Sequence, residues 1–162
     1  MITGVGGLMM VQEVMHAEKK FTLEYVKASP DLPDLEYAHD GDVAFDLRNA
    51  EEEYILKPME KKVFSSGIKM SIPPHHVGSI RDRSGMAAKF SVHTMAGVID
   101  PNFRGEIGIV LINLGKEDFK VEKHMRIAQM LIQPVQIVTL KPTATLSETN
   151  RGEGGFGSSG YK

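Results

Sequence analysis

Residues 96–112 read AGVIDPNFRGEIGIVLI, in which one carboxylate, Asp100, stands between two β-rich runs. Pro101 presets φ and Asn102 tolerates turn conformations, so the stretch predicts a strand, a tight turn and a returning strand. Asp100 should then lie where the first strand gives way to the turn. An acid fixed at the mouth of a hairpin is a candidate general base, although an Asp at such a position can equally do no more than cap the turn.

The returning strand is apolar on both faces. Ile107, Ile109 and Leu111 fall on one side, and Val110 and Ile112 fall on the other. A strand of this kind is covered on both sides. In a domain this small, that pattern favours a contact between subunits.

Short β-rich runs separated by Pro, Gly, Asn and Asp continue in both directions from this stretch. They occupy residues 21–27, 54–56, 62–64, 68–72, 77–80, 107–113, 119–121 and 127–138. The pattern predicts an all-β barrel or sandwich. Helical periodicity is confined to residues 84–90, where Ser84 could cap about two turns.

Composition limits the number of domains and the kinds of partner and metal site that we expect. The chain has 162 residues with 41% hydrophobic content, which suits one domain with a real core. The formal net charge of -2 provides no overall positive field for nucleic acid or an anionic membrane, so neither is expected as a partner. There is no cysteine, and the six histidines show no ligand spacing, so no thiolate or histidine metal site is expected. We expect a cytoplasmic protein.

The two ends differ from the middle. Residues 1–20 are mildly apolar but too short and too polar to span a membrane, and they lack the basic start of a signal peptide. We expect an N-terminal extension there, flexible or packed on a partner, unless it is an expression artefact. The β core should cover residues 21–140. Residues 141–162 are polar, small and glycine-rich, and we expect them to form a flexible C-terminal arm.

The arm carries groups that suit a nucleotide. Residues 151–160 read RGEGGFGSSG, with five glycines around one Arg and one Phe. Arg151 could grip phosphate oxygens and Phe156 could stack on a base, although many Gly/Ser tails are inert. From Leu140 to Phe156 an extended arm spans on the order of 50 Å at about 3.3 Å per residue, which is enough to cross a neighbouring subunit.

Three further positions are ambiguous when taken alone. Residues 81–87, RDRSGMA, place a guanidinium and a hydroxyl at a predicted helix start, which favours an anion or simply a capped, charged turn. Asp46 lies between two apolar residues and needs a donor, for which Arg83 is a candidate. A structural salt bridge explains that pair equally well, and Gln129 poses the same choice.

Taken together and in order, five segments resemble the motifs of the trimeric dUTP pyrophosphatases (dUTPases). They are residues 44–47 (AFDL), 83–87 (RSGMA), 97–106 (GVIDPNFRGE), 126–129 (RIAQ) and 151–160 (RGEGGFGSSG). The resemblance implies a jelly-roll-like, β-clip barrel with one short helix and a flexible C-terminal arm. It also implies a homotrimer with three active sites shared between chains, each closed by an arm from another subunit.

The implied reaction is hydrolysis of dUTP to dUMP and pyrophosphate, which supplies dUMP and keeps uracil out of DNA. A base-activated water would attack the α-phosphorus. Mg2+ would be held by the triphosphate and water, with no direct protein ligand.

The resemblance assigns roles to individual residues. Asp100 would be the base, Phe103 would pack on the deoxyribose, and the backbone of Gly97, Val98 and Ile99 would read the uracil edge. The phosphates would be held by Arg83, Ser84, Gln129, Arg151 and Ser158, with Gly85 and Gly157 also lining the substrate. Phe156 would stack over uracil, and Asp46 would orient Arg83 or the metal's waters without touching the substrate.

Some positions depart from the family pattern. Phe103 stands where Tyr is usual, Asp82 where Pro is common, and Ala44 where Gly is common, while His124 and Met125 replace a usual Gly-Asp turn. These departures bear on local geometry and rate rather than on the reaction.

Two other functions are compatible with parts of this sequence. A dCTP deaminase shares the fold, but its catalytic Glu would fall at Val110, which cannot transfer a proton. A nucleotide-gated regulator, in which substrate orders the tail and the tail or the N-terminal extension recruits a protein partner, is compatible with this sequence alongside catalysis.

Overall fold

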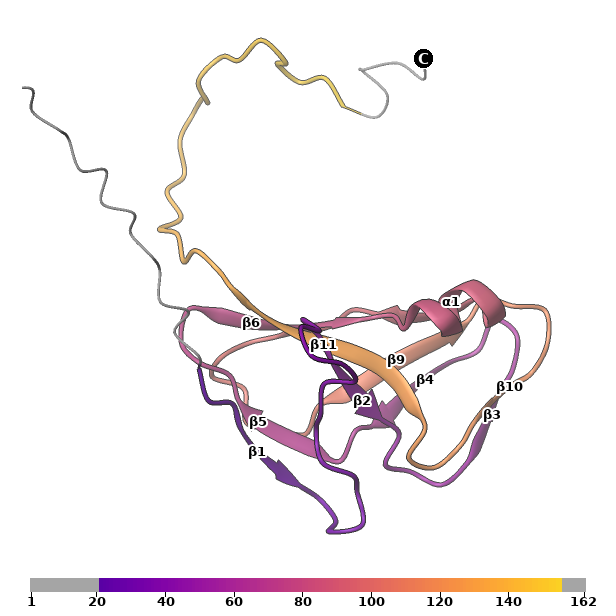
Figure 1. The fold of residues 1–162 in the computed structure, drawn as a ribbon. Coiled ribbons are helices and arrows are strands. Elements are labelled where there is room, and N and C mark those ends of the chain that lie inside the picture. Colours follow the sequence, from indigo (N-terminus) through magenta and orange to yellow (C-terminus); the bar gives the residue numbers. More distant parts are fainter. Residues whose placement is uncertain (1–20, 156–162) are drawn as a thin grey trace, which may run out of the picture.

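A computed structural model describes residues 21–155 of the chain. The expectations for residues 1–20 and for Phe156, Gly157 and Ser158 therefore lie outside the described residues. Within them, eleven strands and one helix follow one another along the chain (Figure 1). The elements are β1 (Glu24–Lys27), β2 (Phe45–Arg48), β3 (Tyr54–Leu56), β4 (Lys61–Ser65), β5 (Ile68–Ser71), β6 (His76–Arg81), α1 (Ser84–Phe90), β7 (Val92–Met95), β8 (Val98–Ile99), β9 (Gly108–Asn113), β10 (Phe119–Val121) and β11 (Arg126–Pro134).

All strand pairs are antiparallel and form four small sheets. The largest has the order β2-β11-β6-β8, and a second has the order β4-β9-β7. Two-stranded sheets β1-β5 and β10-β3 complete the body, and α1 lies at one end of it (Figure 1). This arrangement confirms the predicted all-β fold with one short helix.

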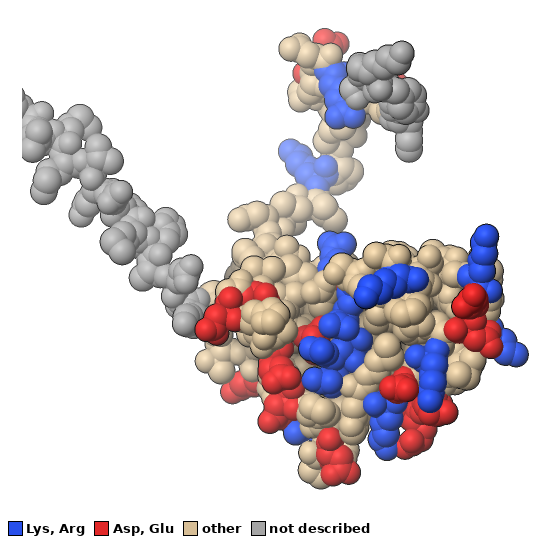
Figure 2. Space-filling model, turned by 45° about the vertical axis from the view of Figure 1, so that its right-hand side comes forward, with Lys and Arg blue, Asp and Glu red and all other residues tan. Residues whose placement is uncertain are grey.

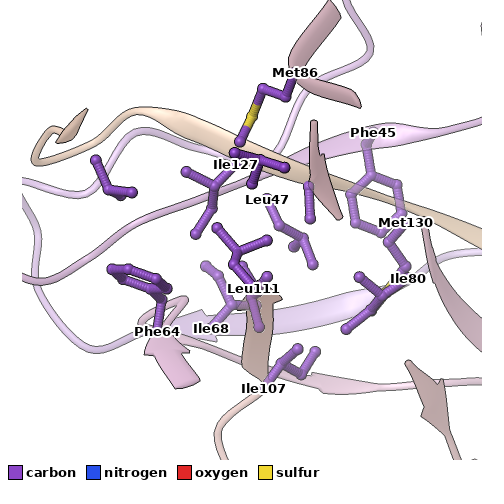
Figure 3. Packing of buried hydrophobic residues seen from close by; sticks show 14 of the residues in the cluster. Phe45, Leu47, Phe64, Ile68, Ile80, Met86, Ile107, Leu111, Ile127 and Met130 are labelled. Atoms are coloured by element: carbon purple, nitrogen blue, oxygen red, sulfur yellow. The ribbon is translucent and has the colours of Figure 1, made fainter. Parts of the chain in front are cut away.

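Alternation of apolar and polar residues builds the core. In β2, Phe45 and Leu47 are buried, while Asp46 and Arg48 between and after them are only half-buried. Such period-two alternation turns one face of a strand inward. Figure 3 shows Leu47 gathered with side chains of other strands around one interior, and Met86, the only buried residue of α1, reaches toward it from above.

The predicted hairpin around Asp100 is wrong. β8 pairs with β6, whereas β9 pairs with β4 on one side and β7 on the other, so the strands flanking the turn belong to different sheets. β9 is the central strand of its sheet, and both of its edges are already filled. The turn at Asp100 therefore connects two sheets instead of closing a ladder.

Strand β9 is apolar on both faces, as predicted. Ile109 and Leu111 are buried in the core, while Val110 and Ile112 are half-buried on the opposite face. That second face is the one for which a subunit contact stays a prediction.

The last strand is shorter than predicted. β11 ends at Pro134, and residues 135–155 contain no strand and leave the β body (Figure 1, orange to yellow). Ile137, Val138 and Leu140 in this segment are 72%, 67% and 88% exposed. In the described part of the chain, no helix is long and apolar enough to cross a membrane.

Candidate active site

Asp100 lies at the end of β8, where the chain turns. The Phe103 N–H donates to the Asp100 carbonyl at 3.1 Å, so the backbone itself closes the turn. The Asp100 side chain is exposed, and no hydrogen bond joins its carboxylate to another described residue. A carboxylate that only capped the turn would accept one of the turn's own N–H groups. The geometry therefore leaves the carboxylate available for a ligand.

The turn is braced by Arg104. Its guanidinium donates to the carbonyls of Pro101 at 2.6 Å and Phe103 at 2.8 Å, and to the Ser71 hydroxyl at 3.1 Å. The Phe103 ring lies over Gly105, where an added Cβ would come within 2.5 Å of the ring. The glycine thus leaves room for the ring, and Phe103 remains 42% exposed. Sequence reasoning missed the role of Arg104, because an arginine beside a turn carries no pattern that indicates which groups it contacts.

The segment before Asp100 presents its backbone at a sheet edge. β8 is the edge strand of its sheet, next to β6. Gly97 has φ +123, and its Cβ would lie 2.9 Å from the Ile80 Cβ, so both its conformation and its surroundings require glycine. Its carbonyl accepts the Ile80 N–H at 2.8 Å, and Val98 is 75% exposed. An edge strand offers unpaired N–H and C=O groups, which can bind the polar edge of a ligand.

A second group of predicted residues meets where β2, β11 and the end of β6 lie side by side. Asp46 accepts from Arg83 Nε at 2.8 Å and from Arg126 Nη1 at 3.3 Å. The Asp46 side chain is 15% exposed and that of Arg83 is 32% exposed. This confirms that Asp46 is a partly buried acid with Arg83 as its donor. A partly buried ion pair is weak evidence for stability, because desolvation offsets much of the attraction, but it orients the guanidinium.

Gln129 of β11 faces the same region. Its amide Nε2 donates to the backbone carbonyl of Asp82 at 2.6 Å. The structure therefore joins Gln129 to the segment that leads into α1, one residue before Arg83.

The start of α1 differs in detail from the prediction. The N-cap residue is Arg83, whose carbonyl accepts from Met86 and Ala87 and whose side chain makes no capping bond. Ser84 is already in the first helical turn, so its predicted role as the cap is wrong. Ser84 and Gly85 are both exposed, and a Cβ added at Gly85 would meet nothing within 4 Å.

One chain does not bring the two groups together. In the pairing of β8 with β6, Val98 lies opposite Ser79 and Ile99 opposite Gly78, so the chain runs toward Val77 as it approaches Asp100. From Val77 to Arg81 the strand covers roughly 13 Å at about 3.3 Å per residue, and Arg83 comes after that. Asp100 and Arg83 thus lie toward opposite ends of β6.

The remaining predicted residues lie apart from both groups. Arg151 is exposed on the C-terminal segment, with its Nε donating to the Gly154 carbonyl at 2.8 Å. Among residues 21–155 there is no cluster of three or more His, Asp or Glu side chains that could hold a metal ion. Figure 2 shows basic and acidic side chains interspersed over one face of the molecule, so an anion would depend on individually placed groups there.

Comparisons with known proteins agree on one family. A sequence model of the dUTPase family matches residues 31–160. Deoxyuridine 5′-triphosphate nucleotidohydrolases of Alkaliphilus metalliredigens and Clostridium kluyveri are 50% and 47% identical to this chain, covering 78% and 76% of it and 89% and 87% of the relatives. The structure of the Staphylococcus bacteriophage 80α dUTPase with dUpNHpp is similar, with a TM-score of 0.77 at 30% identity, covering 87% of this chain and 99% of that one.

Proposed function

Because this chain belongs to the dUTPase family, we propose that it hydrolyses dUTP to dUMP and pyrophosphate and that Asp100 supplies the base. The observation that carries the assignment of the base is the Asp100 carboxylate, exposed at a braced turn and without a partner among the described residues. A free carboxylate can take a proton from a water molecule as that water attacks the α-phosphorus. Pyrophosphate is then the leaving group.

The edge of β8 suits recognition of the nucleoside. The backbone of Gly97, Val98 and Ile99 would pair with the polar edge of uracil, and its fixed donors and acceptors would leave the amino group of cytosine mispaired. The exposed ring of Phe103 would pack on the deoxyribose.

The group around Asp46 suits the phosphates. The Asp46 carboxylate accepts a hydrogen bond from Arg83 Nε, and the Arg126 carbonyl accepts one from Arg83 Nη1 at 3.3 Å. Arg83 Nη2 makes no bond to another described residue and can donate to a phosphate oxygen. Ser84, Gly85 and Gln129 lie nearby in the fold, and Arg151, Phe156, Gly157 and Ser158 would be brought by the arm.

The dUTPase family generally depends on a divalent metal. The donors around Arg83 are guanidinium, amide and hydroxyl groups, which suit phosphate oxygens, and the Asp46 carboxylate is already engaged by two arginines. These residues fit a Mg2+ ion that arrives with the triphosphate and water and has no direct protein ligand. When bound, the ion offsets phosphate charge.

A complete site needs more than one copy of the chain. The groups proposed to act on one triphosphate, Asp100 and Arg83, lie toward opposite ends of β6, so the phosphate-binding groups around one Asp100 come from another copy. The half-buried face of Val110 and Ile112 supports association, and the family resemblance indicates a homotrimer. Residues 135–155 are long enough to reach a neighbour's site.

Product analysis tests the proposal. The protein is incubated with Mg2+ and, separately, with dUTP, UTP, dTTP and dCTP. We expect dUMP and pyrophosphate from dUTP alone. Asp100→Asn should retain dUTP binding but lower kcat by about 10²-fold or more, because general-base catalysis contributes on that order. Wild-type protein that binds dUTP without turning it over would overturn the enzymatic function and favour a nucleotide-gated regulator.

A further inference from the structure

We propose that Asp82 is a positioning residue for the phosphate-binding part of this site. Its carboxylate ties the segment that leads into α1 to strand β7, which follows the helix. The proposal deepens the proposed function and rests on it.

The side-chain hydrogen bonds of Asp82 all go to β7. Its Oδ1 accepts the Thr94 N–H at 2.6 Å and the Thr94 hydroxyl at 2.5 Å, while its Oδ2 accepts from His93 Nδ1 at 2.7 Å. Thr94 is only 8% exposed. Both carboxylate oxygens are therefore engaged by a strand that is packed against β9.

These bonds close a loop around α1. Asp82 precedes the helix and Thr94 follows it, so their hydrogen bonds join the two ends of the segment that contains the helix. We call the bonds from Asp82 to His93 and Thr94 the clamp. Among the helix residues only Met86 is buried, and the Phe90 ring packs on Phe119 at the far end of the helix, with ring centroids 5.2 Å apart. The clamp adds an anchor at the start of the helix, directly beside Arg83.

Asp82 also connects to the other predicted phosphate-binding residues. Its backbone carbonyl accepts the Gln129 amide at 2.6 Å, and Arg83, the next residue, is held by Asp46 at 2.8 Å. Fixing Asp82 therefore fixes the place from which Arg83 extends and the carbonyl that orients the Gln129 amide.

The clamp also explains how the Asp82 carboxylate can lie close to a phosphate-binding site. Burial raises the pKa of Asp82, but the hydrogen bonds from Thr94 and His93 outweigh burial and hold the pKa below its ordinary value. The carboxylate remains ionised, and its charge is directed into β7 instead of toward the phosphates.

The consequence is specific to phosphate binding. A displacement of about 1 Å in a positioning group can cost up to about 10²-fold in rate. Loss of the clamp should weaken binding to the groups around Arg83 and Gln129. Binding of the nucleoside to the β8 edge of Gly97, Val98 and Ile99 should change little, because that edge is held by β6.

The test compares two inhibitors on the full-length enzyme. Pyrophosphate probes the phosphate-binding groups and deoxyuridine probes the nucleoside-binding edge. For Asp82→Ala we expect the inhibition constant of pyrophosphate to rise about tenfold and that of deoxyuridine to change less than about twofold. Asp82→Asn keeps an oxygen that can accept from Thr94, so it should recover most of the loss.

A matched control separates positioning from general stability. Glu51 is another half-buried carboxylate that joins two segments, accepting the Ser65 N–H at 3.0 Å and pairing with Lys62. Glu51→Ala should lower the Tm and leave the ratio of the two inhibition constants unchanged.

An unchanged ratio in Asp82→Ala, or an equal rise in both constants, would overturn the proposal. Turnover of dUTP by the wild-type enzyme is measured in the same assay. Failure of the proposed function would appear there, in the wild type, and is therefore distinct from failure of the clamp.

Discussion

At Gly85, helix stability and substrate binding favour different residues. It lies in the first turn of α1, and an added Cβ would meet nothing within 4 Å in its own chain. Alanine is favoured over glycine in a helix by about 1 kcal/mol, so the fold alone would prefer Ala. In the proposed site, this open space lies on the side from which the substrate's phosphates approach.

Gly85→Ala should therefore leave the Tm unchanged or raise it, yet raise the KM for dUTP by about tenfold, because the methyl group occupies space needed for close approach. Thermal melts and steady-state kinetics check both parts. Lys89→Ala, near the other end of the helix, is the control and should leave KM unchanged. An unchanged KM in Gly85→Ala would mean that the space serves no ligand.

At the residue scale, the sequence predicted contacts whose reason is local chemistry. The sequence predicts that Asp46 finds Arg83, because a carboxylate between two apolar residues needs a donor, and the structure confirms the pair. The bonds of Asp82 to Thr94 and of Arg104 to Ser71 could not be predicted in the same way. Neither Asp82 nor Arg104 lies between two apolar residues as Asp46 does, so nothing in the sequence indicates that it needs a partner.

At the scale of elements, Glu51 joins the turn after β2 to β4. It accepts the Ser65 N–H at 3.0 Å and pairs with Lys62. Burial raises the pKa of Glu51, but the bonds from Lys62 and Ser65 outweigh it and leave the pKa below its ordinary value of 4.5. A lowered pKa in the folded state contributes stability above the ordinary value, and this contribution is lost as pH falls through the folded value.

Glu51→Gln should therefore be less stable than wild type at pH 7, by about 1 kcal/mol or less because the pair is partly exposed. The difference in Tm should shrink as the pH is lowered below 4.5. Thermal melts of both proteins across this pH range make the comparison. A difference in Tm that stays constant with pH would show that the charge of Glu51 contributes nothing.

Elements with a strong local pattern were predicted better than their pairing. The β-rich runs became strands, and residues 84–90 became the helix. The prediction of a hairpin around Asp100 is wrong because the apolar strand β9 pairs with β4 and β7. This pairing depends on the packing of the whole core and not on the residues next to the turn. Buried Asn113, which donates to the carbonyls of Leu56 and Glu117 at 2.9 and 2.8 Å, was also missed, since loop-tying amides carry no periodic signal.

At the scale of the whole molecule, the proposed site is divided between copies of the chain. The register of β8 on β6 directs Asp100 away from Arg83. The half-buried Val110 and Ile112 offer a face for association, as their alternation in the sequence already indicated. The sequence could suggest that copies associate, but only the strand register shows that the proposed base and phosphate-binding groups lie apart.

Subunit complementation tests whether Asp100 and Arg83 of one site come from different chains. Asp100→Asn and Arg83→Ala chains, each inactive alone, carry different mass tags and are refolded together, and native mass spectrometry verifies the mixed assemblies. If Asp100 and Arg83 of one site come from different chains, an equal mixture should regain about a quarter of wild-type dUTP hydrolysis. Half of the sites receive an intact Asp100, and half of those also receive an intact Arg83. If mixed assemblies form and remain as inactive as either parent, both residues act within one chain and the shared site is contradicted.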